Sequence, residues 1–270
     1  MRRASDAAVR LGLVVAALVW VFPYAWMVLT SLKTLPEIVA APTAPLPSSL
    51  YFGAYAEVAR SLSLGRYLAN TAVMAASIAL LQIALALPAG YALAKLRFAG
   101  RSFAFGWVVA CLLVPAQVTF VPVFLLLAKA HLVNTMAALV LPFGASALGT
   151  FLVRQALVQV PDEIIEAARL DGASELRLVY GVLGPMIRPT LAALFLLSFV
   201  FHYNDYFWPL VMTTDDRVRT IPLAIALLRE QGTGVRWHVV MAGNVVLSAP
   251  VLLVFVLGQR HLMRAVTARG

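Results

Sequence analysis

Six long apolar runs, separated by polar segments, dominate the pattern of hydrophobic and polar positions along the chain. The runs cover about residues 11–32, 68–94, 103–127, 136–153, 190–212 and 238–257. An α-helix needs about 20 consecutive apolar residues to cross the hydrocarbon core of a bilayer, and the runs are of about this length. The pattern predicts an all-α, polytopic membrane protein in which residues 1–270 form one domain with six transmembrane helices.

The composition supports a membrane protein and excludes a nucleic-acid partner. Hydrophobic residues make up 62% of the chain and the mean hydropathy is +0.89, whereas about half of the residues of a soluble domain are apolar. The formal net charge of +9 would suit nucleic acid, but only 12% of the residues are charged. The basic residues also lie at the ends of apolar runs, a distribution that orients a protein in a bilayer.

The distribution of basic residues predicts that both termini are cytoplasmic. Of the 21 Lys and Arg residues, 13 lie in the segments expected inside and eight in those expected outside. The first run is longer than the apolar core of a signal peptide, which has about 7–15 residues, so we interpret it as an uncleaved span. The alternative is a removed signal peptide, since Val39-Ala40-Ala41 imitates a cleavage site.

A polar segment at residues 161–185, here called the elbow, interrupts the apolar pattern. Pro161 suits the start of a short helix, Gly172 can end it and Ser174 can help begin a second. The second helix would carry an apolar stripe of Leu176, Val179, Tyr180 and Leu183. Five of the 12 acidic residues lie here: Asp162, Glu163, Glu166, Asp171 and Glu175. Charge of this density belongs in water, so we expect a cytoplasmic loop at residues 155–189.

The spacing of residues in the elbow carries a family resemblance. Glu166-Ala167-Ala168 is followed after three residues by Gly172, and after nine more by Val182-Leu183-Gly184-Pro185. This pattern resembles the EAA loop of bacterial ABC importer permeases, and Asp171-Gly172-Ala173 is similar to the form found in carbohydrate importers. Val182 and Gly184 depart from the usual isoleucine and leucine. The alternative is an amphipathic loop that only connects two spans.

The resemblance covers nearly the whole chain and is strongest to the second permease of maltose-type and glycerol-phosphate-type importers. It implies the type I importer fold, a location in the bacterial cytoplasmic membrane, and a role as a transport subunit and not as an enzyme. In this family the first elbow helix docks on a cytoplasmic ATPase. The resemblance therefore implies that Glu166, Ala167, Ala168, Asp171 and Gly172 make this ATPase contact.

The chain lacks a phosphate-binding loop of its own. Such a loop needs Gly-Lys-Ser/Thr, yet Lys33, Lys95 and Lys129 follow Leu, Ala and Ala. We therefore expect no cofactor in this chain, with ATP and Mg²⁺ bound by partner subunits. The partners that the resemblance implies are a homologous second permease, two ABC ATPases and an extracytoplasmic substrate-binding protein.

The fifth apolar run contains an acidic residue, Asp205, which would cost about 2.5–3.5 kcal/mol facing lipid at the bilayer centre and should face inward. The stretch 203–210 resembles one found in sugar-importer permeases. One interpretation is a substrate pathway in which Asn204 and Asp205 bind sugar hydroxyls and Tyr203 or Trp208 stacks on a sugar ring. The other is that Asp205 caps or braces a neighbouring helix near the outer interface and Trp208 is an interfacial anchor. Gln117 is a weaker pathway candidate.

No residues suggest catalysis or a metal site. The four histidines are scattered, and His202 and Asp205 lack a second carboxylate or a nucleophile nearby. We therefore predict the permease of an ATP-driven importer of a sugar or sugar derivative. The alternatives are a polyol phosphate such as glycerol phosphate or an amino sugar as substrate, an ion-coupled carrier and a membrane enzyme. A carrier would favour paired intramembrane charges, and an enzyme would show clustered acids or histidines.

Overall fold

The computed structural model describes the backbone of residues 2–230 and 235–267 and the side chains of 9–115, 118–228 and 235–256. The prediction of an all-α chain is confirmed, since every regular element in the described ranges is a helix. The chain forms two compact units, one of residues 1–66 with 221–250 and one of residues 67–220 with 251–270. They are called the small unit and the large unit.

The small unit is built from the first helices of the chain and from α13 and the start of α14. Its core joins Ala54 and Val58 of α3 to Leu228 of α13 and to Val239 and Ala242 of α14. An ion pair between Arg236 and Glu57 lies in the same unit. The helices are α1 (Arg2–Ser31), α2 (Leu35–Ala40), α3 (Gly53–Ser61), α13 (Ile221–Glu230) and the first part of α14 (Trp237–Thr267).

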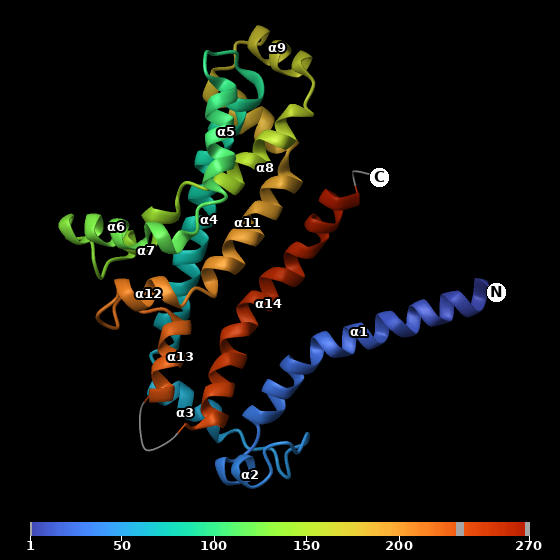
Figure 1. Ribbon diagram of the computed structural model, residues 1–270, viewed down its shortest axis with the longest axis vertical. Helices are drawn as coiled ribbons and strands as arrows, with labels where there is room; N and C mark the ends of the chain where they lie inside the picture. Colours follow the sequence, from blue (N-terminus) through green and yellow to red (C-terminus); the bar gives the residue numbers. More distant parts are fainter. Residues whose placement is uncertain (1, 231–234, 268–270) are drawn as a thin grey trace. The chain divides into compact units, whose positions relative to one another are not determined.

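The large unit is organised along α4, a helix of 32 residues, with α9 at one end of the unit and α12 toward the other (Figure 1). Close packing of α4 on α8 depends on Gly90, because a Cβ there would lie 2.6 Å from Val153 Cγ1. The elements are α4 (Leu64–Lys95), α5 (Arg101–Cys111), α6 (Ala116–Lys129), α7 (Met136–Val140), η1 (Leu141–Phe143), α8 (Ala147–Val158), α9 (Asp162–Leu170), η2 (Arg177–Leu183), α10 (Gly184–Met186), α11 (Arg188–Tyr203) and α12 (Phe207–Met212).

Three helices in the described residues are long and apolar enough to cross a membrane: Val9–Ser31, Leu64–Lys95 and Trp237–Val256. Two bent pairs bring the number to five if each pair is one span. Met136–Phe143 with Ala147–Val158 bends by 46°, and Arg177–Met186 with Arg188–Tyr203 bends by 88°.

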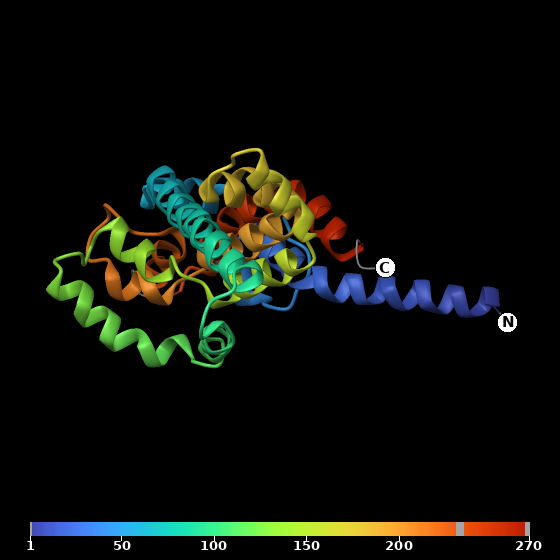
Figure 2. The same cartoon turned by 90° about the horizontal axis from the view of Figure 1, so that it is seen from above.

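Three of the expected continuous spans are interrupted, one of which is the run at 136–153, divided between α7 with η1 and α8. The run at 103–127 is divided between α5 and α6, and the chain changes direction between them (Figures 1 and 2). Pro115 explains this break, because its ring disfavours helical geometry at the preceding residue and it lacks an N–H group. The run at 190–212 is likewise divided between α11 and α12, with residues 204–206 between them.

Candidate functional site

The first elbow helix, α9, begins where the sequence predicted. Pro161 precedes it with a φ of −59°, and Asp162 and Glu163 occupy its first turn, where their charge complements the helix dipole. Lys95, at the end of α4, donates to the Val160 carbonyl at 2.6 Å and to Asp162 Oδ1 at 2.5 Å. The hydrogen bond from Lys95 holds the pKa of the Asp162 carboxyl below its usual range. The start of the elbow is therefore fixed to α4.

The end of α9 confirms the predicted stop at Gly172. Gly172 has a φ of +75°, its N–H donates to the Arg169 carbonyl, and the N–H of Ala173 donates to the Ala168 carbonyl, both at 3.0 Å. These bonds form a Schellman motif, which requires a left-handed residue at this position. A Cβ at Gly172 would meet no atom within 4 Å, so backbone conformation alone favours glycine. Ser174 then accepts from the Arg177 N–H at 3.4 Å, as expected of a residue that helps begin a helix.

The second elbow helix differs from the prediction because η2 is a π-helix. A π-helix has i→i+5 hydrogen bonds and a wider turn than an α-helix. Leu178 and Leu183, five residues apart, therefore share the buried face with Val179. The predicted stripe at α-helical spacing is wrong at Leu176, whose surface is 71% exposed. Tyr180 is also exposed, and its hydroxyl donates to the Ala84 carbonyl of α4 at 2.7 Å.

Four of the five residues expected to contact an ATPase lie on the exposed side of the elbow: Glu166, Ala167, Asp171 and Gly172. Ala168 is half-buried and packs with Ile164 against the core beneath α9. Sequence reasoning did not select Leu170, which is 89% exposed, or Leu176 on the other side of Gly172. The exposure of Leu176 could not be found from the sequence, because this residue fits the apolar stripe predicted for the second helix. The two exposed leucines flank Gly172 in the sequence.

A cavity of about 870 Å³ lies at the other end of the large unit. Its walls come from α6, η1, the end of α11 and the start of α12, and half of its lining residues are aromatic. The lining consists of Thr119, Phe120, Val123, Pro142, Phe143, Val200, Phe201, Asn204, Asp205, Tyr206, Phe207 and Trp208. Among these described residues Asp205 is the single charged side chain.

Of the predicted pathway residues, Asn204, Asp205 and Trp208 line this cavity. Asn204 Nδ2 donates to the Val200 carbonyl at 2.8 Å, and Asp205 Oδ1 accepts from the Trp208 N–H at 3.3 Å. Tyr203 is not among the lining residues, because its side chain is fully buried with its ring 5.5 Å from that of Phe199. The side chain of Gln117 lies outside the described residues.

Trp208 is held firmly in the wall between the cavity and the core. Its Nε1 donates to the Ala138 carbonyl at 2.9 Å, and its ring meets the rings of Phe120 and Phe143 edge-on, at 5.6 and 5.2 Å between centroids. Asp205 accepts from the Trp208 N–H at the start of α12, which is a contact of the capping kind that one interpretation expected. The same residues also border the cavity, so the two interpretations are compatible in space.

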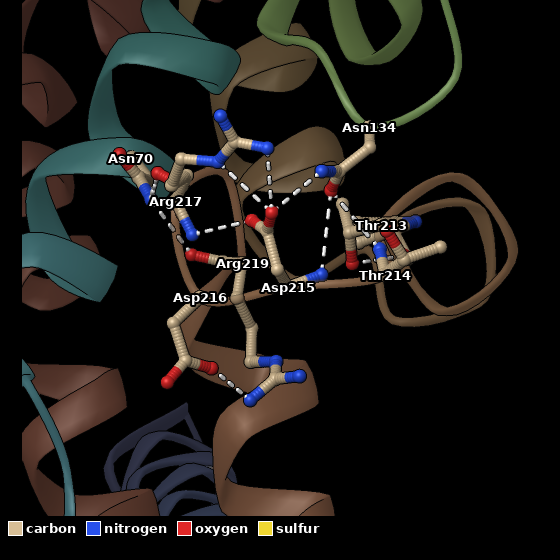
Figure 3. Close-up of polar contacts among 9 residues, drawn as sticks. Asn70, Asn134, Thr213, Thr214, Asp215, Asp216, Arg217 and Arg219 are labelled. Atoms are coloured by element: carbon tan, nitrogen blue, oxygen red, sulfur yellow. Dashed lines mark hydrogen bonds and ion pairs between the residues drawn. The ribbon is translucent and has the colours of Figure 1, made fainter.

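A hydrogen-bonded loop at residues 213–220, here called the α12–α13 loop, follows α12, and Figure 3 shows its polar contacts. Asn134 Nδ2 donates to Asp215 Oδ2 at 2.9 Å, and Asn134 Oδ1 accepts from the Thr214 N–H at 3.0 Å. The Arg217 N–H and Nε also donate to Asp215, each at 2.9 Å. Asn70 of α4 donates to the carbonyls of Arg217 and Arg219, at 2.9 and 3.0 Å. Sequence reasoning had not linked these residues.

Comparison with known proteins decides the family. Residues 82–268 match the model of the binding-protein-dependent transport system inner membrane component family. The chain belongs to this family. It is the permease of an ABC importer, as the elbow motif predicted, and a transport subunit of the inner membrane.

Relatives and solved structures resemble the permease over nearly its full length. The sn-glycerol-3-phosphate transport system permease protein UgpE of Pectobacterium atrosepticum is 32% identical, over 97% of this chain and 96% of that protein. A permease from a bacterial ABC transporter involved in the import of the acidic polysaccharide alginate superposes with a TM-score of 0.82 at 23% identity, covering 96% of each chain. A chain of a bacterial alginate ABC transporter in complex with an alginate pentasaccharide-bound periplasmic protein has a TM-score of 0.59 at 14% identity, covering 98% of this chain and 97% of that one.

The described residues contain no group of three or more His, Cys, Asp or Glu side chains that could hold a metal ion.

Proposed function

We propose that the permease forms half of the pathway of an ATP-driven importer that brings a sugar or sugar derivative into the cytoplasm. The observation that carries this proposal is the exposure of Leu170 and Leu176, which flank the Gly172 turn in the sequence. Exposed apolar surface on a rigid, charged element is typical of a site for another protein. We assign the elbow surface at Glu166, Ala167, Ala168, Asp171 and Gly172 to an ABC ATPase that binds ATP and Mg²⁺.

The remaining partners follow from the same proposal. A homologous second permease completes the pathway, two ATPases bind the elbows of the two permeases, and an extracytoplasmic substrate-binding protein delivers the solute. The elbow and both termini lie in the cytoplasm. The excess of Lys and Arg in the segments on that side supports this orientation.

The cavity supports a neutral polyhydroxylated solute. Aromatic side chains provide faces on which sugar rings stack, and Asn204 and Asp205 provide polar groups that bind hydroxyls. The described lining has no Lys or Arg to neutralise an anion, and the carboxylate of Asp205 would repel a phosphate group. We assign Asn204, Asp205 and Trp208 to substrate contact, with Tyr203 supporting the wall from behind and Gln117 as a further candidate.

A second candidate substrate is glycerol 3-phosphate. The UgpE protein of Pectobacterium atrosepticum, which is 32% identical, is a permease for sn-glycerol 3-phosphate. In that case the positive charge needed for the phosphate would come from the second permease or the binding protein.

Uptake by an Asp205→Asn variant separates the two substrates. The full transporter, reconstituted in liposomes with its binding protein, is supplied with neutral sugars or with glycerol 3-phosphate, and uptake and ATP hydrolysis are measured. For a neutral sugar, losing a hydrogen bond to a charged acceptor should lower uptake about tenfold. For glycerol 3-phosphate, removing the repulsive charge should leave uptake unchanged or raise it.

The control for this experiment is Asp216→Asn, which removes a carboxylate that lies outside the cavity lining. Uptake of a solute without any dependence on ATP would reject the importer mechanism. ATP-dependent uptake of glycerol 3-phosphate alone, undiminished by Asp205→Asn, would replace the first substrate by the second.

A further inference from the structure

Three side chains lock the middle of the elbow to α4. Tyr91 of α4 donates its hydroxyl to Glu175 Oε2 at 2.7 Å, and the Tyr91 hydroxyl oxygen accepts from Arg169 NH2 at 2.7 Å. Arg169 Nε donates to Glu175 Oε1 at 3.0 Å, which closes the triangle. The Tyr91 side chain is buried, whereas Arg169 and Glu175 are about half exposed. These residues form what we call the Tyr91 triad.

The triad spans the break in the elbow. Arg169 lies in the last turn of α9, and Glu175 lies just before η2, on the other side of Gly172. The hydrogen bond from Tyr91 also holds the pKa of Glu175 below its usual range, so the carboxylate stays ionised at neutral pH. Since Lys95 fixes the start of α9 through Asp162, α4 holds the elbow at the start of α9 and again on both sides of Gly172.

The same helix reaches the cavity and the α12–α13 loop. Gln82 Nε2 donates to the carbonyl of Phe143, whose ring lines the cavity, at 2.9 Å. Asn70, near the other end of α4, holds the α12–α13 loop through two backbone carbonyls. From Asn70 to Tyr91 the helix extends roughly 30 Å at 1.5 Å per residue, about the thickness of the hydrocarbon core. A movement of the elbow that is transmitted to Tyr91 therefore reaches the cavity wall along one helix.

We propose that the Tyr91 triad is a positioning device that couples movement of the elbow to α4 and, through Gln82, to the cavity wall. This inference rests on the proposed function, because it assumes that an ATPase moves the elbow. A helix can transmit a rigid-body movement only through contacts that persist during the movement. The triad provides such a contact, since each of its members binds the other two.

The test measures the number of ATP molecules hydrolysed per solute imported. In Tyr91→Phe the ring still packs but the triad loses its shared hydroxyl. We expect uptake to fall about five- to tenfold while solute-stimulated ATP hydrolysis falls less than about twofold, a loss of coupling of the size typical between distant sites. Tyr24→Phe is the matched control, because it removes the hydroxyl of an exposed tyrosine that belongs neither to the elbow nor to α4.

Charge-reversal variants provide a second, independent test of the Tyr91 triad. Arg169→Glu and Glu175→Arg should each uncouple uptake from hydrolysis, because each places two like charges side by side. The double variant restores an opposite pair that can still share the Tyr91 hydroxyl, and it should recover most of the coupling. Recovery of this kind is not expected if the two residues serve stability alone or contact the ATPase separately.

Two results would overturn the inference. One is an unchanged ratio of ATP to solute in Tyr91→Phe and in both single reversals, with all variants inserted normally. The other is single reversals that uncouple while the double variant does not recover. Failure of the proposed function is distinguishable, because the unmodified transporter would then show no ATP-dependent uptake at all.

Discussion

The elbow and the α12–α13 loop are two polar turns held by the same helix, but they use their polar residues differently. In the α12–α13 loop, the carboxylate of Asp215 accepts hydrogen bonds from Asn134 and Arg217, so this charged group is satisfied within the permease. The elbow is fixed to α4 by Lys95 and Tyr91, yet it leaves Glu166 and Leu170 exposed. The α12–α13 loop thus bonds its charged group within the permease, whereas the elbow is held rigidly and leaves a surface uncovered.

This difference shows how two turns of similar composition can have different roles. A turn whose donors and acceptors are paired internally stabilises the fold and gives little to a partner. A turn that is fixed to a helix and exposes apolar side chains can be bound and moved by another protein without unfolding. The following predictions test this distinction, from the largest expected effect to the smallest.

The largest effect should follow Gly172→Val in the elbow. A β-branched residue at a φ of +75° costs about 1–2 kcal/mol, and the chain should relieve this strain by leaving the Schellman turn. ATP-dependent uptake should fall by at least about tenfold, while the protein still inserts in the membrane.

Gly172→Asn is the control for this prediction, because asparagine tolerates the left-handed conformation and no neighbouring atom lies within 4 Å of the added Cβ. It should retain most of the uptake. Equal loss in the valine and asparagine variants would mean that the space around Gly172, and not its conformation, is what the transporter needs.

Asn134→Ala should weaken the α12–α13 loop without abolishing ATP hydrolysis. Asn134 has a φ of +63° and connects to Thr214 and Asp215 through its side chain, so alanine loses these bonds and adds backbone strain. The free energy of unfolding should fall by about 1–3 kcal/mol, measured by thermal or denaturant unfolding in detergent.

Asn134→Gly separates the two causes, because glycine adopts the same conformation without strain but supplies no side chain. Its stability should lie between those of the alanine variant and the unmodified protein. A glycine variant as stable as the unmodified protein would show that the Asn134 side-chain bonds contribute nothing.

The smallest effect concerns acid stability of the α12–α13 loop. The hydrogen bonds from Arg217 and Asn134 lower the pKa of Asp215 to about 2, below the ordinary value of 3.8. Because the folded pKa is depressed, the stabilisation is present at neutral pH and is lost as the pH falls from about 4 to about 2. In Asp215→Asn this part of the pH dependence of unfolding should disappear, and a profile identical to that of the unmodified protein would contradict the assignment.

Local features of the elbow were predictable from the sequence. Pro161, Gly172 and Ser174 act on their immediate neighbours, so their residue types alone indicated where α9 begins and ends and where the second helix begins. The winding of η2 was not predictable, because the apolar residues at 176, 179, 180 and 183 also fit an α-helical stripe. Tertiary packing of Leu178 and Leu183 favours the wider π-helix instead.

Contacts distant in sequence could not be predicted. Tyr91 is 78 residues from Arg169 and 84 from Glu175, and no local pattern links them. At the cavity, the sequence indicated that Asp205 should avoid lipid but left two interpretations open. The hydrogen bond from the Trp208 N–H and the position of Asp205 in the cavity lining required the fold to be known.

The winding of η2 has a consequence for how the elbow is aimed. Each residue of an ordinary α-helix turns the chain by about 100°, so a one-residue deletion that converted a π-turn to an α-turn would change the phase of everything before it. Leu170 and Gly172 would then point in another direction relative to α11, although every residue of the EAA motif would remain. The orientation of the elbow relative to α11 therefore depends on the seven residues Arg177–Leu183. These residues lie outside the Glu-Ala-Ala and glycine positions by which such loops are recognised.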